Sequence, residues 1–480
     1  MVPTVKITSK LSPGDPEAEL SQALRPRLAI ISTYDELCGI AGYTRALERQ
    51  LQPLMEVEVL DLDQYLLRSP YPRVQKLGDR HIRDMAARLR GFDTVNIQLE
   101  HGTLGTTPRQ ILRRFRWLAH AAPRLTVTFH TILDEVTMPW GHVAKEALRF
   151  RLSAAAGTLF ANLRASALKR GIYHEIARQQ RRKPVHVITH TKRDMRLLRD
   201  VHRLRNVDHH PLSFVAPGDA AAIRAAARRE AFPMMKRLPE GAKLIGTFGF
   251  LSPYKGFETA LEALRYLPEN HHLLVFGGIH PQAIARNSPR DSYIERLLSM
   301  GRIGRSMLDT LQSDHGAMTL TLDASTRDLL SRHPQDLHDR LHFMGVLDDA
   351  EFMTAMALCD AVVLPYLEVG QSSSGPIAMA LEMGCRVIAS RTRAFLQFAR
   401  YHPGRVEFFD IGNFAELARR IEAGPPPDHP GAPVFNTTTN AALYHRVSLP
   451  PGIVPPKEEP GGEEAALAAA LDAIRTRELA

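Results

Sequence analysis

Residues 361–390 read AVVLPYLEVGQSSSGPIAMALEMGCRVIAS, and this stretch decides the fold class. It begins with an apolar run typical of a buried strand, passes through a small, hydroxyl-rich turn into helix-compatible sequence, and ends in a second apolar run. This order indicates a parallel strand–helix–strand unit. Pro376 suits the first turn of the helix, and the turn before it offers hydroxyls and closely spaced backbone N–H groups. The turn therefore predicts a pocket for an anion, with a merely well-capped helix as the alternative.

The same alternation of apolar runs and helix-compatible segments continues through most of the chain. A first series comprises RLAIIST (27–33), MEVEVLDL (55–62), DTVNIQLE (93–100), RLTVTFHT (124–131) and KPVHVITHT (183–191). A second series comprises KLIGTFGF (243–250), HHLLVFGG (271–278), RLHFMGV (340–346), DAVVLPY (360–366), CRVIAS (385–390) and VEFFD (406–410). We therefore expect an α/β protein of two doubly wound, Rossmann-like domains, whose strand ends face each other across a ligand-binding cleft.

The expected domain boundaries follow changes in composition. We place a flexible N-terminal arm at 1–26, the first domain at 27–215 and the second at 216–425, where an Ala- and Arg-rich connector begins the second domain. Residues 426–480 indicate a Pro-rich segment, a return helix and a C-terminal tail. The segment 282–338 is long for one connection, which predicts a partly helical insertion.

The composition is that of a globular protein. Hydrophobic residues make up 44% of the chain and charged residues 24%, and no apolar run approaches the roughly 18 residues of a membrane span. The N-terminus lacks a basic start followed by an apolar core, so no export signal is expected. Three cysteines without metal-ligand spacing fit a reducing cytoplasm and predict neither a disulfide framework nor a metal site.

Much of the net positive charge lies between residues 145 and 205. This run holds sixteen Lys or Arg residues against four acids, in a chain whose net charge is +9. Three interpretations compete: a solvated helix face, a surface facing anionic lipid, and a nucleic-acid site. No nucleic-acid-binding module accompanies the run, so we expect no nucleic-acid partner. We predict that the protein works in the cytoplasm, peripherally at the inner face of a membrane.

Seven motifs in order carry a resemblance to a known family. They are CGIAGYT (38–44), VNIQLEHGTLG (95–105), VTFHTILDE (127–135), GTFGFLSPYKGFETALEAL (246–264), LLVFGGIHP (273–281), LHFMGVLDDAEFMTAMALCDAVVLPY (341–366) and SSSGPIAMALEMGCRVIAS (372–390). Together they span roughly residues 27–425. The chain resembles retaining, nucleotide-sugar-dependent glycosyltransferases of the GT-B fold, family 4. This resemblance implies an acceptor-side first domain and a donor-binding second domain.

The expected diphosphate site combines a lysine with the serine-rich turn. Lys255 lies at a strand-to-helix turn just before Gly256, where a mobile full charge would add to the pull of a helix N-terminus on anions. The resemblance makes Lys255 the lysine that holds the donor's diphosphate, with a surface lysine beside a turn glycine as the alternative. The anion expected at the opening turn is the same diphosphate, held by four consecutive residues: Ser372, Ser373, Ser374 and Gly375.

Residues at the strand ends of the first domain are the expected sugar and acceptor contacts. Gly39 and Ile40 follow the first strand, where small residues let the acceptor or the donor's phosphate approach the backbone. His130 ends an apolar strand, and the resemblance implies that it touches the transferred sugar, whereas a lone strand-end histidine is otherwise usually structural. Glu100 ends another strand and is expected to bind a hydroxyl of either substrate.

The chain departs from the family pattern at three positions. Alignment on Gly384 and Pro376 places Gln371 and Met379 where the family carries two glutamates, and Phe250 where it carries an arginine. Glutamine still forms hydrogen bonds with a sugar hydroxyl, but methionine cannot accept two strong hydrogen bonds from a ribose diol. Glu382 lies most of a turn beyond Met379, so its carboxylate reaches the site only if the alignment slips. The loss of the arginine removes one cation from the diphosphate.

The function that the resemblance implies is retaining transfer of a hexose from a nucleotide-diphosphate sugar to an acceptor hydroxyl, in polysaccharide or glycoconjugate assembly. Lys255 and the turn would stabilise the departing diphosphate, while Gln371 and His130 hold the sugar. The acceptor would be a glycan or a lipid-linked molecule, and no cofactor or metal is expected. One alternative is a glycosyltransferase-like subunit that binds a glycan or a partner without turnover. A third, lesser interpretation is a sugar-phosphate synthase with a small soluble acceptor.

Overall fold

The computed structural model describes most of both expected domains. The described residues are 25–36, 38–100, 102–132, 167–279, 292–300, 324, 328, 337, 339–425 and 434–449. The expected N-terminal arm before residue 25, the C-terminal tail after 449, the residues 145–166 of the basic run and most of the 282–338 insertion lie outside the described residues.

The first domain is built on a parallel six-stranded sheet in the order β2-β1-β3-β4-β5-β6. Its strands are β1 (Arg27–Ser32), β2 (Glu56–Asp61), β3 (Thr94–Leu99), β4 (Leu125–Phe129), β5 (Val185–Thr189) and β6 (Val207–His209). Strand β1 is central, and Leu28 lies opposite both Val57 of β2 and Thr94 of β3. Strands of this kind are buried on both faces, which explains why each one reads as a continuous apolar run.

The second domain repeats this architecture with a parallel sheet in the order β12-β11-β10-β7-β8-β9. Its strands are β7 (Lys243–Phe248), β8 (His271–Phe276), β9 (Leu341–Gly345), β10 (Ala361–Leu364), β11 (Val387–Ser390) and β12 (Val406–Phe409). In both sheets the strand order reverses beside the first strand of the domain. Ligands bind at such a switch point, beyond the carboxyl ends of the strands.

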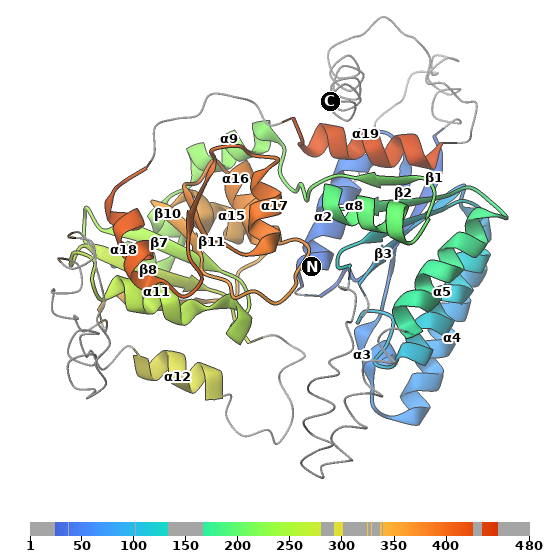
Figure 1. Ribbon diagram of the computed structural model, residues 1–480, viewed down its shortest axis with the longest axis horizontal. Helices are drawn as coiled ribbons and strands as arrows, with labels where there is room; N and C mark the ends of the chain where they lie inside the picture. The colour runs from blue at the N-terminus through green and yellow to red at the C-terminus, as the bar shows by residue number, and fades with distance from the viewer. Residues whose placement is uncertain are drawn as a thin grey trace, which may run out of the picture.

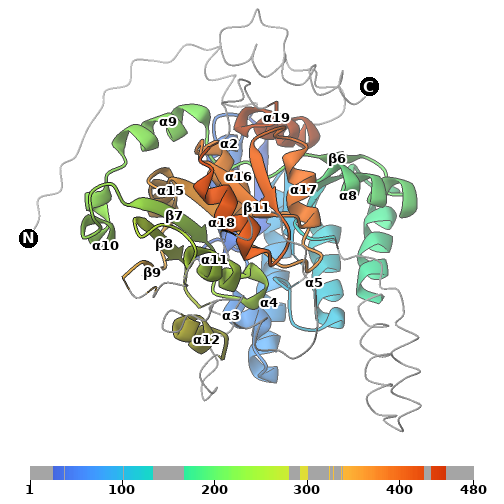
Figure 2. The same ribbon diagram turned by 60° about the vertical axis from the view of Figure 1, so that its left-hand side comes forward.

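Helices cover both faces of each sheet (Figures 1 and 2). Those of the first domain are α2 (Gly39–Leu51), α3 (Gln64–Arg68), α4 (Pro72–Arg88), η1 (Leu89–Gly91), α5 (Pro108–Ala121), the helical residues 167–180, α8 (Lys192–Arg196) and the π-helix η2 (Leu197–Val201). Those that follow are α9 (Pro217–Ala226), η3 (Arg229–Ala231), α10 (Pro233–Lys236), η4 (Pro253–Lys255), α11 (Phe257–Leu264), α12 (Ser292–Met300), α15 (Asp349–Ala357), α16 (Gly375–Glu382), α17 (Arg393–Ala399), α18 (Phe414–Glu422) and α19 (Thr437–Ser448).

Alternation along β1 shows how the layers are assigned. Leu28 and Ile30 pack with α2 and α19, whereas Ala29 and Ile31 pack with α4, α5 and the helix at 167–180. The core that contains Leu28 continues into the second domain, where it includes residues of α15, α16 and α17. Helices α11 and α18 cover the opposite face of the second sheet. The two domains therefore share one hydrophobic core across their junction.

The last helix, α19, returns to the first domain after the chain has completed the second (Figures 1 and 2). The Tyr444 hydroxyl lies 2.9 Å from Thr128 Oγ1 of β4, and Asn440 Nδ2 donates to Gln50 Oε1 of α2 over 2.7 Å. His210 Nε2 lies 2.7 Å from Thr439 Oγ1. Two Rossmann-like domains joined in this way form the GT-B architecture, and the α/β prediction is confirmed.

Candidate active site

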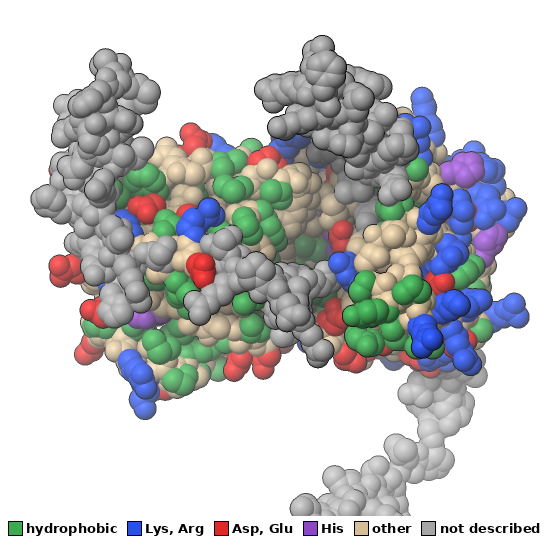
Figure 3. Space-filling model, turned by 90° about the horizontal axis from the view of Figure 1, so that it is seen from below, with side chains coloured by type: hydrophobic (Ala, Val, Ile, Leu, Met, Phe, Trp, Pro, Cys, Tyr) green, Lys and Arg blue, Asp and Glu red, His purple; other side chains and the backbone are tan. Residues whose placement is uncertain are grey.

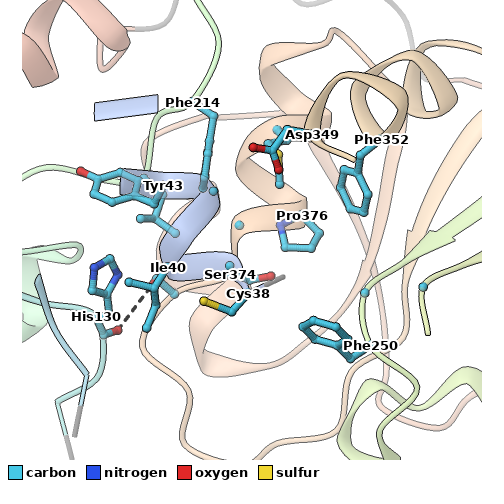
Figure 4. Close-up of a pocket in the computed structure, with 18 of the residues that line it drawn as sticks. Cys38, Ile40, Tyr43, His130, Phe214, Phe250, Asp349, Phe352, Ser374 and Pro376 are labelled. Carbon is cyan, nitrogen blue, oxygen red and sulfur yellow. Dashed lines mark hydrogen bonds between the residues drawn. The ribbon is translucent and has the colours of Figure 1, made fainter. Parts of the chain in front are cut away.

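A pocket of about 520 Å³ lies between the two domains. The first domain contributes the start of α2 and the loops after β3 and β4, and the second contributes the loops after β7, β8, β9 and β10. Because these loops all follow the carboxyl ends of parallel strands, the two sheets face each other across the pocket, as the sequence predicts. The view into the pocket shows His130 and Tyr43 on one side and Phe250, Phe352 and Pro376 on the other (Figure 4).

Lys255 lines this pocket but is not the mobile surface cation that its sequence context predicts. It ends η4, is only 5% exposed, and its Nζ donates to the Tyr366 hydroxyl while lying 3.9 Å from the centre of that ring. Burial lowers the pKa of Lys255 to about 7. Gly256 adopts a left-handed φ of 62°, and a Cβ at this glycine would lie 2.1 Å from the Pro365 carbonyl oxygen. The strand-to-helix turn thus needs glycine and directs the lysine inward.

The serine-rich turn divides its hydroxyls between the two domains. Ser372 Oγ accepts a hydrogen bond from the Ile132 amide over 3.1 Å, and Ser373 Oγ donates to the His130 carbonyl over 3.4 Å. Ser374 is the N-cap of α16 without a side-chain capping bond, and its buried hydroxyl has no hydrogen-bond partner of normal geometry within the described residues. Ser373, Ser374 and Gly375 line the pocket, whereas Ser372 faces the first domain instead.

The uncapped start of α16 and the buried lysine both line the cavity, and both offer it positive charge. The first amides of a helix lack partners inside the helix, and they lie at the positive end of its dipole. Lys255, Ser374 and Gly375 line the same pocket, and within the described residues no carboxylate pairs with Lys255. A buried cation without a counterion is costly, and an anionic ligand would remove that cost.

His130 is held at the end of β4 in one orientation. Its Nε2 lies 2.7 Å from Gln98 Oε1, and Gln98 in turn donates from Nε2 to Asn96 Oδ1 over 2.6 Å. Since Gln98 Oε1 only accepts, His130 Nε2 carries the proton and its Nδ1 is left as an acceptor. The ring is 8% exposed, and burial together with the nearby His190 holds the pKa of His130 well below its usual value. His130 is therefore a neutral hydrogen-bonding group at physiological pH.

The remaining expected contacts also meet at this pocket. Gly39 and Ile40 line it, but they begin α2 rather than forming a loop, with Cys38 as the N-cap. Glu100 lines the pocket and accepts a hydrogen bond from the Thr131 hydroxyl over 2.8 Å. Gln371 lines it at the start of the serine-rich turn. Of the ten expected contact residues, the structure thus brings all but Ser372 to one cavity.

A pair of charged residues that the sequence analysis overlooks crosses the pocket. Arg45 of α2 donates from Nε to Asp349 Oδ2 of α15 over 2.8 Å, and from another guanidinium nitrogen to the Tyr34 carbonyl over 2.7 Å. Arg49, one turn further along α2, also lines the pocket and is exposed. The only sequence signal for these arginines is their spacing of four residues on the helix after the first strand, which places both on one face.

The departures from the family pattern are visible in the pocket. Phe250 and Met379 both line it, so two expected charged positions are occupied by apolar side chains. Glu382 is not in the pocket, which agrees with its place in the alignment. Its carboxylate accepts hydrogen bonds from the Ser213 hydroxyl over 2.6 Å and from the amides of Phe214 and Val215, and burial raises the pKa of Glu382 to about 7. Glu382 therefore holds the connection between the domains.

The described part of the basic run combines buried or paired cations with exposed ones such as Arg181, Arg182 and Arg205. Lys169 is 6% exposed. Lys183 Nζ donates to the Ala119 and Ala122 carbonyls, and Arg178 pairs with the buried Glu175 over 2.8 Å. Among the helices that the structure describes, none combines the length and apolarity of a bilayer span. The same residues contain no group of three or more His, Cys, Asp or Glu side chains placed to hold a metal ion.

Comparisons with known proteins support the fold. No protein-family model matches the chain, and no curated protein matches it. Its structure is similar to sucrose-phosphate synthase from Thermosynechococcus elongatus, with a TM-score of 0.50 at 16% identity over 95% of this chain and 99% of that one. It is also similar to a UDP-forming α,α-trehalose-phosphate synthase from Burkholderia vietnamiensis, with a TM-score of 0.50 at 11% identity over 83% and 91%.

A further solved structure with this architecture contains ligands. HepE from Anabaena, in complex with UDP and glucose, gives a TM-score of 0.47 at 14% identity over 83% of this chain and 89% of that one. At these identities the comparison shows that the present chain has the GT-B fold.

Proposed function

We propose that the protein is a retaining glycosyltransferase of the family 4 type, which moves a hexose from a nucleotide-diphosphate sugar to an acceptor hydroxyl. One observation carries the proposal: a buried lysine without a carboxylate partner faces the uncapped start of α16 within the described part of the pocket. A diphosphate supplies the charge that this arrangement lacks. The UDP bound in the HepE structure is a ligand of this class, which supports the choice.

In the proposed reaction the protein acts mainly through position and charge. Protonated Lys255, the Ser374 hydroxyl and the first amides of α16 stabilise the negative charge that develops on the departing diphosphate. Neutral His130 accepts a hydrogen bond at Nδ1, and Gln371 offers both a donor and an acceptor, so the two side chains orient the sugar. Glu100 lies on the acceptor side of the cavity. No metal ion or cofactor is part of this proposal.

The acceptor in this proposal is a glycan or a lipid-linked molecule, and the product belongs to polysaccharide or glycoconjugate assembly. The pocket lies between the domains, and first-domain residues such as Glu100 and Ile40 line it together with residues of the second domain. We place the protein in the cytoplasm, with peripheral attachment to the membrane.

A nucleotide panel tests the proposal. The full chain is titrated with UDP, GDP, ADP and their glucose conjugates while thermal unfolding is followed, and the stabilising nucleotide sugar is then incubated with a lipid-linked acceptor extract. We expect one nucleotide to raise the midpoint temperature of unfolding. In the incubation with the extract we expect the free nucleotide to be released and the transferred sugar to keep the anomeric configuration that it has in the donor. Stabilisation by none of the nucleotides would contradict donor binding. Stabilisation without turnover on any acceptor would favour the binding-subunit alternative.

A further inference from the structure

A group of exposed apolar side chains lies on the first domain near the mouth of the pocket. Tyr65 of α3 is 77% exposed, Tyr71 before α4 is 69% exposed, and Leu77 of α4 is 53% exposed. The two tyrosines are the most exposed large apolar side chains in the described part of the chain. Burying so much apolar surface would be favourable, and a cluster of this kind marks an interaction site more often than single exposed residues do.

Unpaired cations accompany these side chains. Arg73 and Lys76 lie on the same turn of α4 as Leu77, are exposed, and form no ion pair or hydrogen bond within the described residues. The acids of α4 are already engaged: Asp79 pairs with Arg113 and Arg114, and Asp84 with Arg80. Figure 3 shows hydrophobic side chains beside Lys and Arg side chains over the first domain, at the right of the view. We call Tyr65, Tyr71, Leu77, Arg73 and Lys76 the α3–α4 patch.

The α3–α4 patch is fixed to the acceptor side of the pocket. Arg68 of α3 donates to the Gly102 carbonyl over 2.8 Å, and Gln64 donates to the Thr103 carbonyl over 3.0 Å. The fully buried Arg114 donates hydrogen bonds to the carbonyls of Leu67 and Leu104, each over 2.9 Å. The loop 102–104 comes directly after Glu100, which lines the pocket. The patch and this wall of the pocket therefore form one rigid unit at the carboxyl edge of the first sheet.

We propose that the α3–α4 patch docks on an anionic lipid bilayer. Tyrosine is favoured at the boundary between apolar and aqueous phases, and Lys or Arg beside it is attracted to anionic headgroups. A second copy of this chain fits less well, because two-fold pairing would set Arg73 and Lys76 against their own copies. This surface is distinct from the basic run at 145–205 that the sequence analysis considers, because it lies on α3 and the start of α4.

Docking by this patch defines where an acceptor would be presented. This consequence rests on the proposed transferase function: the acceptor is lipid-linked, and its reacting hydroxyl lies close to the headgroup layer. The patch holds the loop next to Glu100 against the membrane, so an acceptor anchored in lipid reaches the pocket without leaving the bilayer. A small soluble acceptor would have no use for this arrangement.

Sedimentation of the full chain with vesicles tests the proposal. The vesicles are phosphatidylcholine with and without phosphatidylglycerol, at two salt concentrations. The parent should bind the anionic vesicles, and binding should weaken between 0.1 M and 1 M salt as the Debye length shrinks from about 10 Å to about 3 Å. Tyr65→Ser with Tyr71→Ser should weaken binding at least about tenfold, and Arg73→Gln with Lys76→Gln about 25-fold, at roughly fivefold per cation.

The matched control removes two exposed cations from the second domain, Lys236→Gln with Arg237→Gln on α10, and should bind as the parent does. Parent-like vesicle binding by both patch variants, or equal recovery of the parent with neutral and anionic vesicles, would overturn the proposal. Dimers of the parent that both patch variants abolish would also overturn it in favour of a second copy. Binding of UDP, GDP and ADP is measured in the same samples. Vesicle binding without binding of any of these nucleotides would refute the proposed function and leave the docking surface intact.

Discussion

At the scale of single residues, we expect the charge state of Lys255 to control donor binding. The pKa of this lysine is about 7 in the free protein because the side chain is buried. The diphosphate of UDP-glucose keeps its charge over the neutral range and binds the protonated lysine. Above pH 7 binding must therefore take up a proton, and we expect the affinity for UDP-glucose to fall from pH 6 to pH 8 in calorimetric titrations.

Lys255→Ala should weaken UDP-glucose binding about tenfold to 100-fold, since a hydrogen bond to a charged group contributes about 1.5–3 kcal/mol. It should also remove the pH dependence. The control is Lys243→Ala, which removes an exposed lysine of the same domain that pairs with Asp360. An affinity within twofold of the parent, or an unchanged pH profile, would show that Lys255 does not contact the donor.

Gln371 tests whether hydrogen bonding alone is enough at the position of the family's glutamate. Gln371→Ala removes the polar contacts that this side chain makes with the sugar in the proposed site, whereas Gln371→Glu keeps a hydrogen-bond acceptor. We therefore expect Gln371→Ala to lower kcat more than Gln371→Glu, with little change in the affinity for UDP itself. Initial rates at a saturating donor concentration measure kcat for the two variants and show which one is slower. Equal and negligible effects of both substitutions would mean that the turn does not bind the sugar.

In the proposed donor site, Asp349 supplies the carboxylate acceptor for the ribose hydroxyls that Met379 lacks. It is the only carboxylate that the described second-domain residues contribute to the pocket, and Arg45 engages only one of its oxygens. We expect Asp349→Asn to abolish a roughly tenfold preference for UDP over 2′-deoxy-UDP, because the carboxylate accepts from the ribose hydroxyls. Arg45→Ala should keep the preference. A preference that Asp349→Asn leaves unchanged would assign Asp349 to the ion pair alone.

At the scale of elements, the junction between α16 and the interdomain connection depends on one carboxylate. Glu382→Ala leaves the Ser213 hydroxyl and the amides of Phe214 and Val215 buried without their acceptor, so we expect a loss of about 2–4 kcal/mol in the free energy of unfolding. Urea titrations measure this loss. Glu382→Gln keeps one acceptor oxygen and should lose less. An equal loss of unfolding free energy in Glu382→Ala and Glu382→Gln would contradict the role of Glu382 as a hydrogen-bond acceptor.

The same carboxyl makes stability depend on pH. Burial raises the pKa of Glu382 to about 7, above the ordinary value of 4.5 that it has in the unfolded chain. Between pH 4.5 and pH 7 the folded protein therefore holds a proton that the unfolded chain has lost. This contribution to stability is complete below pH 4.5 and is lost as the pH rises through 7. The parent should therefore lose stability between pH 5 and pH 8 relative to Glu382→Gln.

The elements themselves are largely readable from the sequence, whereas the contacts between them are not. Every strand except the short β6 is expected from the sequence, because parallel strands with two buried faces appear as continuous apolar runs. Lys255 is expected from its place at a strand-to-helix turn, and Gln371 from the alignment with the family. The burial of Lys255 depends on Tyr366, and the Arg45–Asp349 pair joins residues 304 positions apart. Local patterns carry no information on such pairs, since only packing of the two domains brings them together.

At the scale of the whole molecule, α19 makes the first domain depend on the end of the chain. Tyr444 is 1% exposed and bonds to β4, so Tyr444→Ala should cost about 3–5 kcal/mol, whereas Tyr444→Phe should cost about 1 kcal/mol. Trp117 and Trp140 both precede residue 216, so tryptophan fluorescence reports on the first domain and circular dichroism on both. In urea the fluorescence transition of Tyr444→Ala should move to lower concentration. Unchanged fluorescence and dichroism midpoints would contradict this dependence.

The return of α19 also determines how the molecule opens. The chain passes between the domains twice, once between β6 and α9 and once between α18 and α19, and two tethers allow rotation mainly about the line that joins them. We therefore expect the domains to open by rotation about this line, with little freedom to twist or slide. The gap widens most at the end far from α19, where α3 lies (Figure 1). We expect substrates to enter and products to leave at that end.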